Sequence, residues 1–329
     1  MNIRPFSLAL AGVALATAAN ALAQDGRAAQ DYPTRPVKLI VAAATGSSPD
    51  AISRQLANAL GTKWKQPVVI ENAVGLGGII GAEKAARQPA DGYTLVVSTS
   101  GAMSVGASLM KLSYDPVKDF EPVALVMFMP NLLVVHPDVP VKNLQELIAY
   151  GKQHPNKLRY GHPGIGTTPH LSAELLKDMT GLRMQPIPYK SSAQMATDLL
   201  AGHYEVLFHN SSVMLPHVQS GGARPLGVTS AERVATLPEV PTVAQAGDLQ
   251  GFEVNAWWGV YAPAGTPAEL LARLNADIVQ ALQQPAISGW IREQGGQVGG
   301  GTPQDLREHQ RQEASRWAAL IEKAGIKAQ

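Results

Sequence analysis

Strand-like and helix-like segments alternate along the 329-residue chain, and this alternation constrains the fold more than any other feature. Residues 36–41 are rich in β-branched side chains, whereas Ile52, Leu56, Ala59 and Leu60 recur at the spacing of one helix face. Further strands are predicted at 67–71, 93–98, 132–135, 158–160, 184–189 and 204–208, and helices at 79–87, 144–152, 169–179, 193–201, 267–283 and 303–324. The alternation predicts an α/β fold with mostly parallel sheets. At roughly 150 residues per domain, the length suggests two domains.

Residues 1–23 have the pattern of a secretory signal peptide. Arg4 gives a positively charged start, residues 8–18 are small and apolar, and Ala21-Leu22-Ala23 is a cleavage signature before Gln24. The apolar run is shorter than the roughly 18–20 residues that span a bilayer, which favours a cleaved signal over a membrane anchor. No later run reaches that length, so we expect a soluble mature protein. The alanine-rich signal favours the bacterial periplasm.

Charge and cysteine content exclude several classes of function. Lys plus Arg number 27 and Asp plus Glu 26, and cleavage after residue 23 removes only Arg4, which leaves a balanced chain. Nucleic-acid affinity comes mainly from neutralised phosphates, so we expect no nucleic-acid partner. The chain has no cysteine, which excludes disulfides and thiolate metal sites. It also lacks a His-Glu-x-x-His motif, so we predict no metal site.

Glycines and small hydroxyl-bearing residues follow five of the predicted strands. Ligands of open parallel sheets bind beyond the carboxyl ends of the strands, where glycine allows close approach to the backbone and helix N-termini attract anions. These loops occupy 44–48, 98–101, 164–168, 190–192 and 210–212. The ligand contacts predicted in them are Thr45, Gly46, Ser47, Ser48, Ser98, Thr99, Ser100, Gly166, Thr167, Thr168, Lys190 and Asn210. Lys190 is the one cationic side chain in the five loops, so neutral donors would have to hold most of the charge of an anion.

The first and third of these loops share one pattern. Gly46-Ser47-Ser48-Pro49 and Gly166-Thr167-Thr168-Pro169 each read glycine, two hydroxyls and proline before a predicted helix. Two facing helix N-termini would grip a small anion across a cleft. The alternative is that Ser-Pro and Thr-Pro are simply good helix starts. Five such loops at successive strand ends favour a ligand site.

Patterns for catalysis or for a bound cofactor are incomplete. Residues 75–81 nearly match a dinucleotide fingerprint, but Ile80 stands where the third glycine is required, and strand 93–98 does not end in an acidic residue. Residues 108–111 fit a Ser-x-x-Lys motif, yet no Lys-Thr-Gly follows and no Gly-x-Ser-x-Gly occurs. We therefore predict no catalytic residue and no cofactor.

A histidine and a tryptophan outside these motifs are further candidates. His209 ends a predicted strand, where it could make a polar contact with a ligand. Capping, packing or solvent roles are favoured over metal binding for the pairs 162/170 and 209/217, which are spaced at i, i+8. The Trp257-Trp258 pair belongs either to the core or to a cleft wall, and Trp257 is retained as a candidate contact.

An ordered set of short segments resembles one known family. The segments are Leu39-Ile40-Val41 through Asp50, Val68 to Glu71 with Gly75-Leu76-Gly77-Gly78, Asp91-Gly92-Tyr93-Thr94-Leu95, Tyr114-Asp115-Pro116, Tyr160-Gly161-His162-Pro163-Gly164-Ile165-Gly166-Thr167, Pro188-Tyr189-Lys190, Leu237-Pro238-Glu239-Val240-Pro241-Thr242 and Ala262-Pro263-Ala264-Gly265-Thr266-Pro267. In this order they resemble the Bug family, the periplasmic solute receptors of tripartite tricarboxylate transporters. The similarity covers nearly all of the mature chain.

The resemblance implies a type II periplasmic binding fold, in which two α/β lobes joined by crossover strands close on a ligand. It divides the chain into one lobe of residues 24–127 plus 250–329 and a second lobe of residues 128–249. Members of the family typically bind small carboxylates, through a first loop that corresponds to 45–48 and a second that corresponds to 166–168. The chain would then be a monomer that passes an organic acid to a membrane permease, with Tyr189 added to the candidate contacts.

Departures from the family pattern bear on ligand specificity. Ala43 stands where the family usually has an aromatic residue, Ser191 follows Lys190 in place of glycine, and His209 replaces an acidic residue. More room and one carboxylate fewer favour an aromatic or multiply charged carboxylate as ligand. Two other functions stay open from the sequence: an exported enzyme acting on a small acid, and a ligand-sensing receptor for a membrane kinase.

Overall fold

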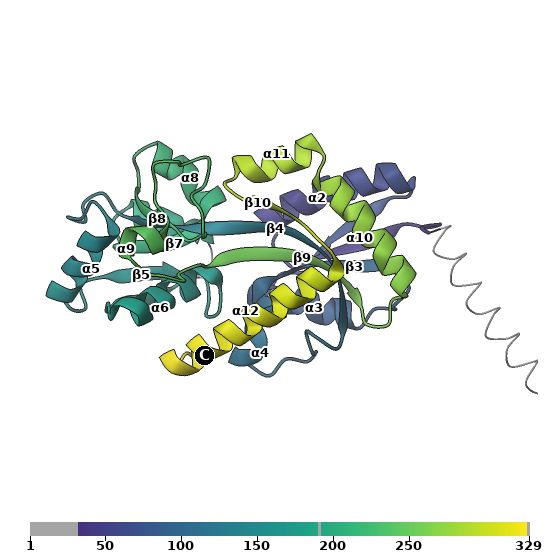
Figure 1. The fold of residues 1–329 in the computed structure, drawn as a ribbon, viewed down its shortest axis with the longest axis horizontal. Coiled ribbons are helices and arrows are strands. Elements are labelled where there is room, and N and C mark those ends of the chain that lie inside the picture. The colour runs from purple at the N-terminus through teal and green to yellow at the C-terminus, as the bar shows by residue number, and fades with distance from the viewer. Residues whose placement is uncertain (1–31, 190–191, 328–329) are drawn as a thin grey trace, which may run out of the picture.

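The computed structural model describes residues 32–189 and 192–327, which form two α/β lobes (Figure 1). The strands are β1 (Val37–Val41), β2 (Val68–Asn72), β3 (Thr94–Thr99), β4 (Phe120–Val135), β5 (Arg159–His162), β6 (Gln185–Pro188), β7 (Val206–Asn210), β8 (Arg224–Val228), β9 (Asn255–Pro263) and β10 (Gln297–Gly300). The helices are α2 (Ser48–Trp64), α3 (Ile79–Ala86), α4 (Gly106–Leu109), α5 (Leu144–Gln153), α6 (Thr168–Thr180), α7 (Ser192–Leu200), α8 (Ser211–Gln219), α9 (Val243–Gly247), α10 (Ala268–Leu282), α11 (Pro285–Glu293) and α12 (Pro303–Ala324), with short helical turns η1 (Leu76–Gly78) and η2 (Gly101–Val105) before α3 and α4. The predicted signal peptide and Lys190 lie outside the described residues.

The parallel strand pairs lie at the two ends of the strand order, one set in each lobe, and the strands that join the lobes pair antiparallel. In the first lobe β1 lies between β2 and β3 and is parallel to both, and in the second lobe β5 has the same relation to β6 and β7. Strands β4 and β9 pair antiparallel with each other, and β4 continues beside β7 and β8. The strand order β2-β1-β3-β9-β4-β7-β5-β6 therefore runs through both lobes. This arrangement confirms the predicted two-lobed α/β fold with crossover strands. The sheets are mixed and not mostly parallel as predicted, because four of the strand pairs in the described residues are parallel and five are antiparallel.

Strand β4 extends well before its predicted part, residues 132–135. Proline donates no backbone hydrogen bond and is rare inside strands, so Pro122 and Pro130 concealed the rest of β4. The register of β4 against β9 shifts directly after Pro122, and Pro130 is the last β4 residue that pairs with β9. From Asn131 onward β4 pairs with β7. Both prolines thus stand where the ladder is already interrupted or changes partner.

Helices cover both faces of each lobe. In the first lobe α2, α10 and α11 pack on one face of the sheet, and α3 packs on the other. In the second lobe α5, α6 and α9 cover one face, and α7 and α8 cover the other. None of the helices in the described residues is long and apolar enough to cross a membrane.

Helix α12 packs against both lobes, along one side of the molecule (Figure 1). Leu306, near its start, belongs to a first-lobe core cluster, whereas Trp317 and Ile321 belong to a core cluster of the second lobe. Between them the Gln310 amide donates to the Met103 carbonyl at 2.9 Å. Because α12 and β4 each contact both lobes, the predicted division at residues 127/128 and 249/250 stays a prediction.

The buried carboxylate of Glu313 on α12 should make stability depend on pH. Its side chain is 12% exposed, and Oε2 accepts a 2.8 Å hydrogen bond from Trp317 Nε1. Burial raises the pKa of Glu313 above its usual value, despite the hydrogen bond from Trp317 and the nearby Arg316. The folded protein therefore holds this proton at pH values where the unfolded chain has released it, so folding stability falls as pH rises through that interval. Glu313→Gln cannot lose stability in this way. We therefore expect the free energy of unfolding of the variant to increase relative to that of the wild type as pH rises from about 4.5 to 7.

Urea unfolding of both proteins across this pH range measures the effect. Glu308→Gln on the same helix is the control, because hydrogen bonds from Arg311 and Gln312 lower the pKa of Glu308 to about 2. Glu308 is ionised in both the folded and the unfolded chain above pH ~5, so its substitution should give a constant difference there. Parallel pH profiles for Glu313→Gln and the wild type would show that Glu313 ionises normally.

Candidate ligand-binding site

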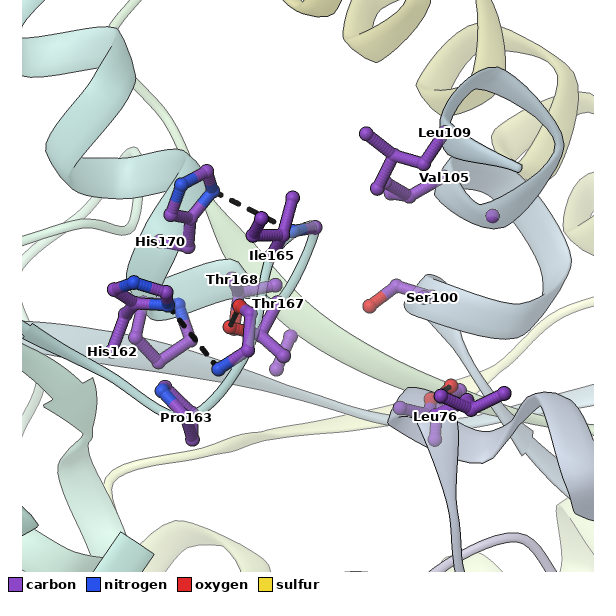
Figure 2. A pocket seen from close by; sticks show the side chains of 18 of the residues that line it. Leu76, Ser100, Val105, Leu109, His162, Pro163, Ile165, Thr167, Thr168 and His170 are labelled. Carbon is purple, nitrogen blue, oxygen red and sulfur yellow. Dashed lines mark hydrogen bonds between the residues drawn. The ribbon is translucent and has the colours of Figure 1, made fainter. Parts of the chain in front are cut away.

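A cleft of about 840 Å³ lies between the lobes. The first lobe contributes residues 76, 77, 79, 99–101, 105, 106, 109 and 110, and the second contributes 162–170, 186, 188, 209 and 210. Ala256 and Trp258 of crossover strand β9 also line it. Figure 2 shows the loop that carries Ile165 and Thr167 facing Val105 and Leu109 across the cleft. Within the described residues, no Lys, Arg, Asp or Glu side chain lines this cleft.

The second-lobe wall is the loop between β5 and α6. Thr167 is the N-cap of α6, and its hydroxyl donates to the Gly164 carbonyl at 2.7 Å. Gly166 has φ +79°, a left-handed conformation that favours glycine. The first N–H groups of a helix have no acceptor inside that helix and carry the positive end of its dipole. This wall can therefore donate hydrogen bonds to an anion without any charged side chain.

The equivalent loop of the first lobe has the same conformation. Ser47 is the N-cap of α2, and its hydroxyl donates to the Ala44 carbonyl at 2.6 Å. Gly46 has φ +81°, close to the value at Gly166. Strand β1 ends just before this loop, as β5 does before its counterpart. The sequence match between the two loops therefore reflects one local structure used in both lobes.

The N-terminus of α2 contacts α8 of the second lobe, whereas the sequence analysis expected it to face the N-terminus of α6. The Ser48 hydroxyl lies 3.0 Å from the Ser212 hydroxyl in the first turn of α8. Residues 44–48 are not among those that line the cleft, and the wall opposite Gly166 is formed by η2 and α4. The helix N-termini that approach each other across the lobes are thus those of α2 and α8.

The predicted site residues divide into two groups by position. Those that line the cleft are Thr99, Ser100, Gly166, Thr167, Thr168, His209 and Asn210. Those that lie elsewhere are Thr45, Gly46, Ser47, Ser48, Ser98, Tyr189 and Trp257. Ser98 is fully buried, and the Tyr189 hydroxyl donates to Asp198 at 2.9 Å. Lys190 lies outside the described residues, and the ligand contacts of the whole set stay a prediction.

Trp257 and Trp258 lie on opposite faces of β9, as neighbours in a strand do. Trp258 lines the cleft, whereas Trp257 is 1% exposed and packs in the first-lobe core beside Leu306. The sequence analysis predicted that the pair belongs either to the core or to a wall of the cleft, and the structure places one tryptophan in each position. Because side chains alternate between the two faces of a strand, the sequence could indicate that the two tryptophans point in opposite directions. It could not indicate which of them faces the cleft.

The apolar part of the cleft was not predicted. It is formed by Leu76, Ile79, Val105, Leu109 and Met110 in the first lobe, and by Pro163, Ile165, Pro186 and Pro188 in the second. Leu109 belongs to a four-residue helix, which is too short to show helical periodicity in the sequence. The cleft thus combines a wall of neutral donors with an apolar wall.

Two buried histidines lie beside the loop of residues 164–168, which we call the donor loop, and both line the cleft (Figure 2). His162 ends β5 and His170 lies in the first turn of α6, and their ring centroids are 4.8 Å apart. Burial lowers the pKa of both, that of His170 to about 4, so both rings are neutral at pH 7. No group of three or more His, Cys, Asp or Glu in the described part of the chain is placed to hold a metal ion.

Comparison with known proteins identifies the family. Residues 52–326 match the model of the tripartite tricarboxylate transporter family receptor. Protein BugT of Bordetella pertussis is 36% identical over 322 residues, which cover 97% of this chain and 98% of BugT. Rpa4515 of R. palustris, solved with adipate, is 39% identical with a TM-score of 0.82, and the match covers 90% of this chain and 99% of that one. MatC of Rhodopseudomonas palustris, solved with bound malate, is 32% identical with a TM-score of 0.78 and coverage of 88% and 100%. By its match to the family model and its similarity to these relatives, the chain belongs to the tripartite tricarboxylate transporter receptor family, as its resemblance to the Bug proteins predicted.

Proposed function

We propose that this chain is a periplasmic receptor that binds a small organic carboxylate in the cleft between its lobes and passes it to a membrane permease. The observation that carries the proposal is the donor loop 164–168, which faces the cleft at the N-terminus of α6. A carboxylate removed from water needs its oxygens hydrogen-bonded, and fixed N–H and hydroxyl donors meet that need. Adipate in Rpa4515 and malate in MatC are ligands of the same chemical class.

The apolar wall favours an acid with an apolar body. Leu76, Val105 and Leu109 stand across the cleft from the donor loop, and they would contact a ring or a methylene chain. A second carboxylate on the ligand would also depend on neutral donors, such as Ser100 or Asn210, among the described residues. An aromatic acid or a dicarboxylate with an apolar spacer therefore fits better than a small, densely charged acid. Of the three departures from the family pattern, His209 lines the cleft, Ala43 does not, and Ser191 lies outside the described residues.

The proposed role is capture and delivery without turnover. The cleft holds neutral histidines and hydroxyls, and the family is one of transporter receptors. Delivery fits a protein exported by the predicted signal peptide and docked as a monomer on its permease. These partner and location assignments rest on the family and on the sequence pattern.

Thermal unfolding of the mature chain from Gln24 with a panel of acids tests the proposal. The panel contains adipate, malate, benzoate and terephthalate at neutral pH. A ligand that binds only the folded state, at about 100 times its dissociation constant, adds about 2.7 kcal/mol of stability, which is a readily measured shift. We expect a shift with at least one acid that carries an apolar body.

Adipamide and benzamide, the neutral amides of two of these acids, are the matched controls. They keep the shape of the acid and lose its charge, so they should give little or no shift. Equal shifts with acid and amide would show that the donor loop does not select a carboxylate. No shift with any acid, in a chain that unfolds cooperatively, would contradict the proposed function.

A further inference from the structure

The two matched loops are each held by a side chain four residues after the loop glycine. The Gly46 N–H donates to Asp50 Oδ2 at 2.9 Å, and the Gly166 N–H donates to His170 Nδ1 at 3.5 Å. Asp50 and His170 both follow the proline in the first helical turn, and both are buried, with 2% and 6% of their surface exposed. One lobe thus uses a carboxylate and the other an imidazole for the same purpose.

In each loop, the first backbone N–H that stays available to an outside acceptor is the first N–H of the helix. The N-cap amides of Ser47 and Thr167 are also used inside the protein, since they donate to the carbonyls of Ala44 and Gly164. The amides of Ser48 and Thr168 come first in α2 and α6 and have no acceptor within their helices. Fixing the loop glycine therefore fixes the direction of a donor that an outside acceptor can use.

Asp50 and His170 are each in a protonation state that can accept the hydrogen bond from the loop glycine. Asp50 also accepts hydrogen bonds from Arg54 Nε and from Asn72, at 3.0 and 2.9 Å. Burial opposes ionisation of Asp50, but the bonds from Arg54, Gly46 and Asn72 outweigh it and lower its pKa, so it is a carboxylate at neutral pH. A neutral His170 ring whose Nδ1 accepts a hydrogen bond must carry its proton on Nε2.

The second-lobe loop has an additional tether. The Gly164 N–H donates to His162 Nδ1 at 3.3 Å, so two neighbouring imidazoles hold the two glycines on either side of Ile165. Position 42, where the first lobe would need a similar acceptor, is Ala42. The loop that lines the cleft thus has two such tethers, each longer than the single bond to the Asp50 carboxylate in the first lobe.

We propose that His170 is a positioning residue, which sets ligand affinity by holding the Gly166 loop in its binding conformation. The inference rests on the proposed function, because it assigns His170 to the same ligand site. His170 lines the cleft, but this role does not require contact with the ligand, and Asp50 holds the matching loop outside the cleft.

A series of His170 variants separates positioning from packing. In His170→Asn the side-chain oxygen stands as many bonds from the backbone as Nδ1 does, so the acceptor is kept. His170→Leu has similar bulk and no acceptor, and His170→Gln carries its acceptor one atom farther out. With adipate as the probe, we expect His170→Asn to stay within about 3-fold of the wild-type affinity and His170→Leu to bind about 10-fold or more weakly, because a buried N–H loses its partner.

Calorimetric titration at neutral pH measures these affinities. Equal affinity in His170→Leu and the wild type would overturn the proposal. If His170→Leu does not fold, the comparison is between Asn and Gln: weaker binding in His170→Gln supports positioning, and equal binding of the two overturns it.

A ligand-free measurement distinguishes failure of this inference from failure of the proposed function. Long-range ¹H–¹⁵N correlation spectra report which ring nitrogen of His170 carries the proton. We expect the Nε2–H form at neutral pH in the wild-type chain, and an Nδ1–H form or a protonated ring would overturn the tether. Lack of adipate binding by a wild-type chain with the expected ring would instead count against adipate as ligand and against the proposed function.

Discussion

Gly166→Ala is expected to weaken ligand binding by about 100-fold, the largest loss of affinity that a single methyl group should cause in this protein. Gly166 has φ +79°, and an alanine there is strained by roughly 1–2 kcal/mol. Its Cβ would also lie 2.3 Å from Leu109 Cδ1 and 3.2 Å from Val105 Cγ1, across the cleft on the first lobe. Relieving such a contact adds a similar amount, and together these give about 3 kcal/mol, or roughly 100-fold.

The loss should fall on binding more than on folding. Without ligand, the loop can relax to another backbone conformation and the lobes can separate by a small amount, which removes both the strain and the clash. Ligand binding requires the loop conformation and the close approach of the lobes, so the relaxation must then be reversed. The midpoint of thermal unfolding without ligand should change little.

Gly46→Ala is the matched control. Gly46 has nearly the same φ, +81°, but a Cβ built there meets no atom within 4 Å. The control therefore carries the backbone strain without a contact at the cleft, and because Gly46 does not line the cleft we expect little or no loss of affinity. Titration of both variants with the acid that stabilises the wild type most would compare them. Equal losses in the two variants would show that contact between Gly166 and Leu109 plays no part.

Local chemistry made the conformation of the two matched loops predictable, whereas the cleft wall opposite Gly166 depends on how the lobes pack. Glycine, hydroxyls and proline before a helix specify one conformation, and both loops adopt it. Which surface faces Gly166 is set by contacts between segments distant in sequence, and the facing residue Leu109 lies in a short helix without a periodic pattern. For the same reason the sequence did not show that Ser48 meets Ser212.

The same distinction between local sequence and distant contacts explains which parts of the fold were predicted. Strands β1, β2, β3, β5 and β7 were predicted because each is a short run of strand-favouring residues between turn residues or helical stripes, and β6 was predicted although it contains Pro186 and Pro188. The first part of β4 was missed because proline usually excludes a strand, and here Pro122 and Pro130 stand at breaks in the ladder that only the partner strands reveal. Helix α12 was predicted as an element, but its contacts with both lobes were not.

Trp317→Ala should cause a large loss of stability, and the loss should appear in the second lobe although α12 begins in the first. Trp317 is 1% exposed and lies in the second-lobe core together with Tyr160 and Leu171. Truncation of a buried tryptophan to alanine removes its packing and leaves a cavity, at a cost of about 3–5 kcal/mol. It also removes the hydrogen bond to the buried Glu313 carboxylate. Urea unfolding should show the loss as a lower midpoint.

Trp317→Phe and hydrogen exchange locate the effect. Phenylalanine keeps an aromatic ring in the core but loses the donor to Glu313, so we expect a smaller loss of about 1–3 kcal/mol. In Trp317→Ala the amides of β5 and β7 should exchange faster, while those of β1 and β3 in the first lobe should change less, because exchange follows local opening. Since α12 contacts both lobes, loosening its far end should also weaken the coupling between them and thereby lower ligand affinity. Unchanged exchange in β5 and β7 would show that Trp317 does not hold α12 to the second lobe.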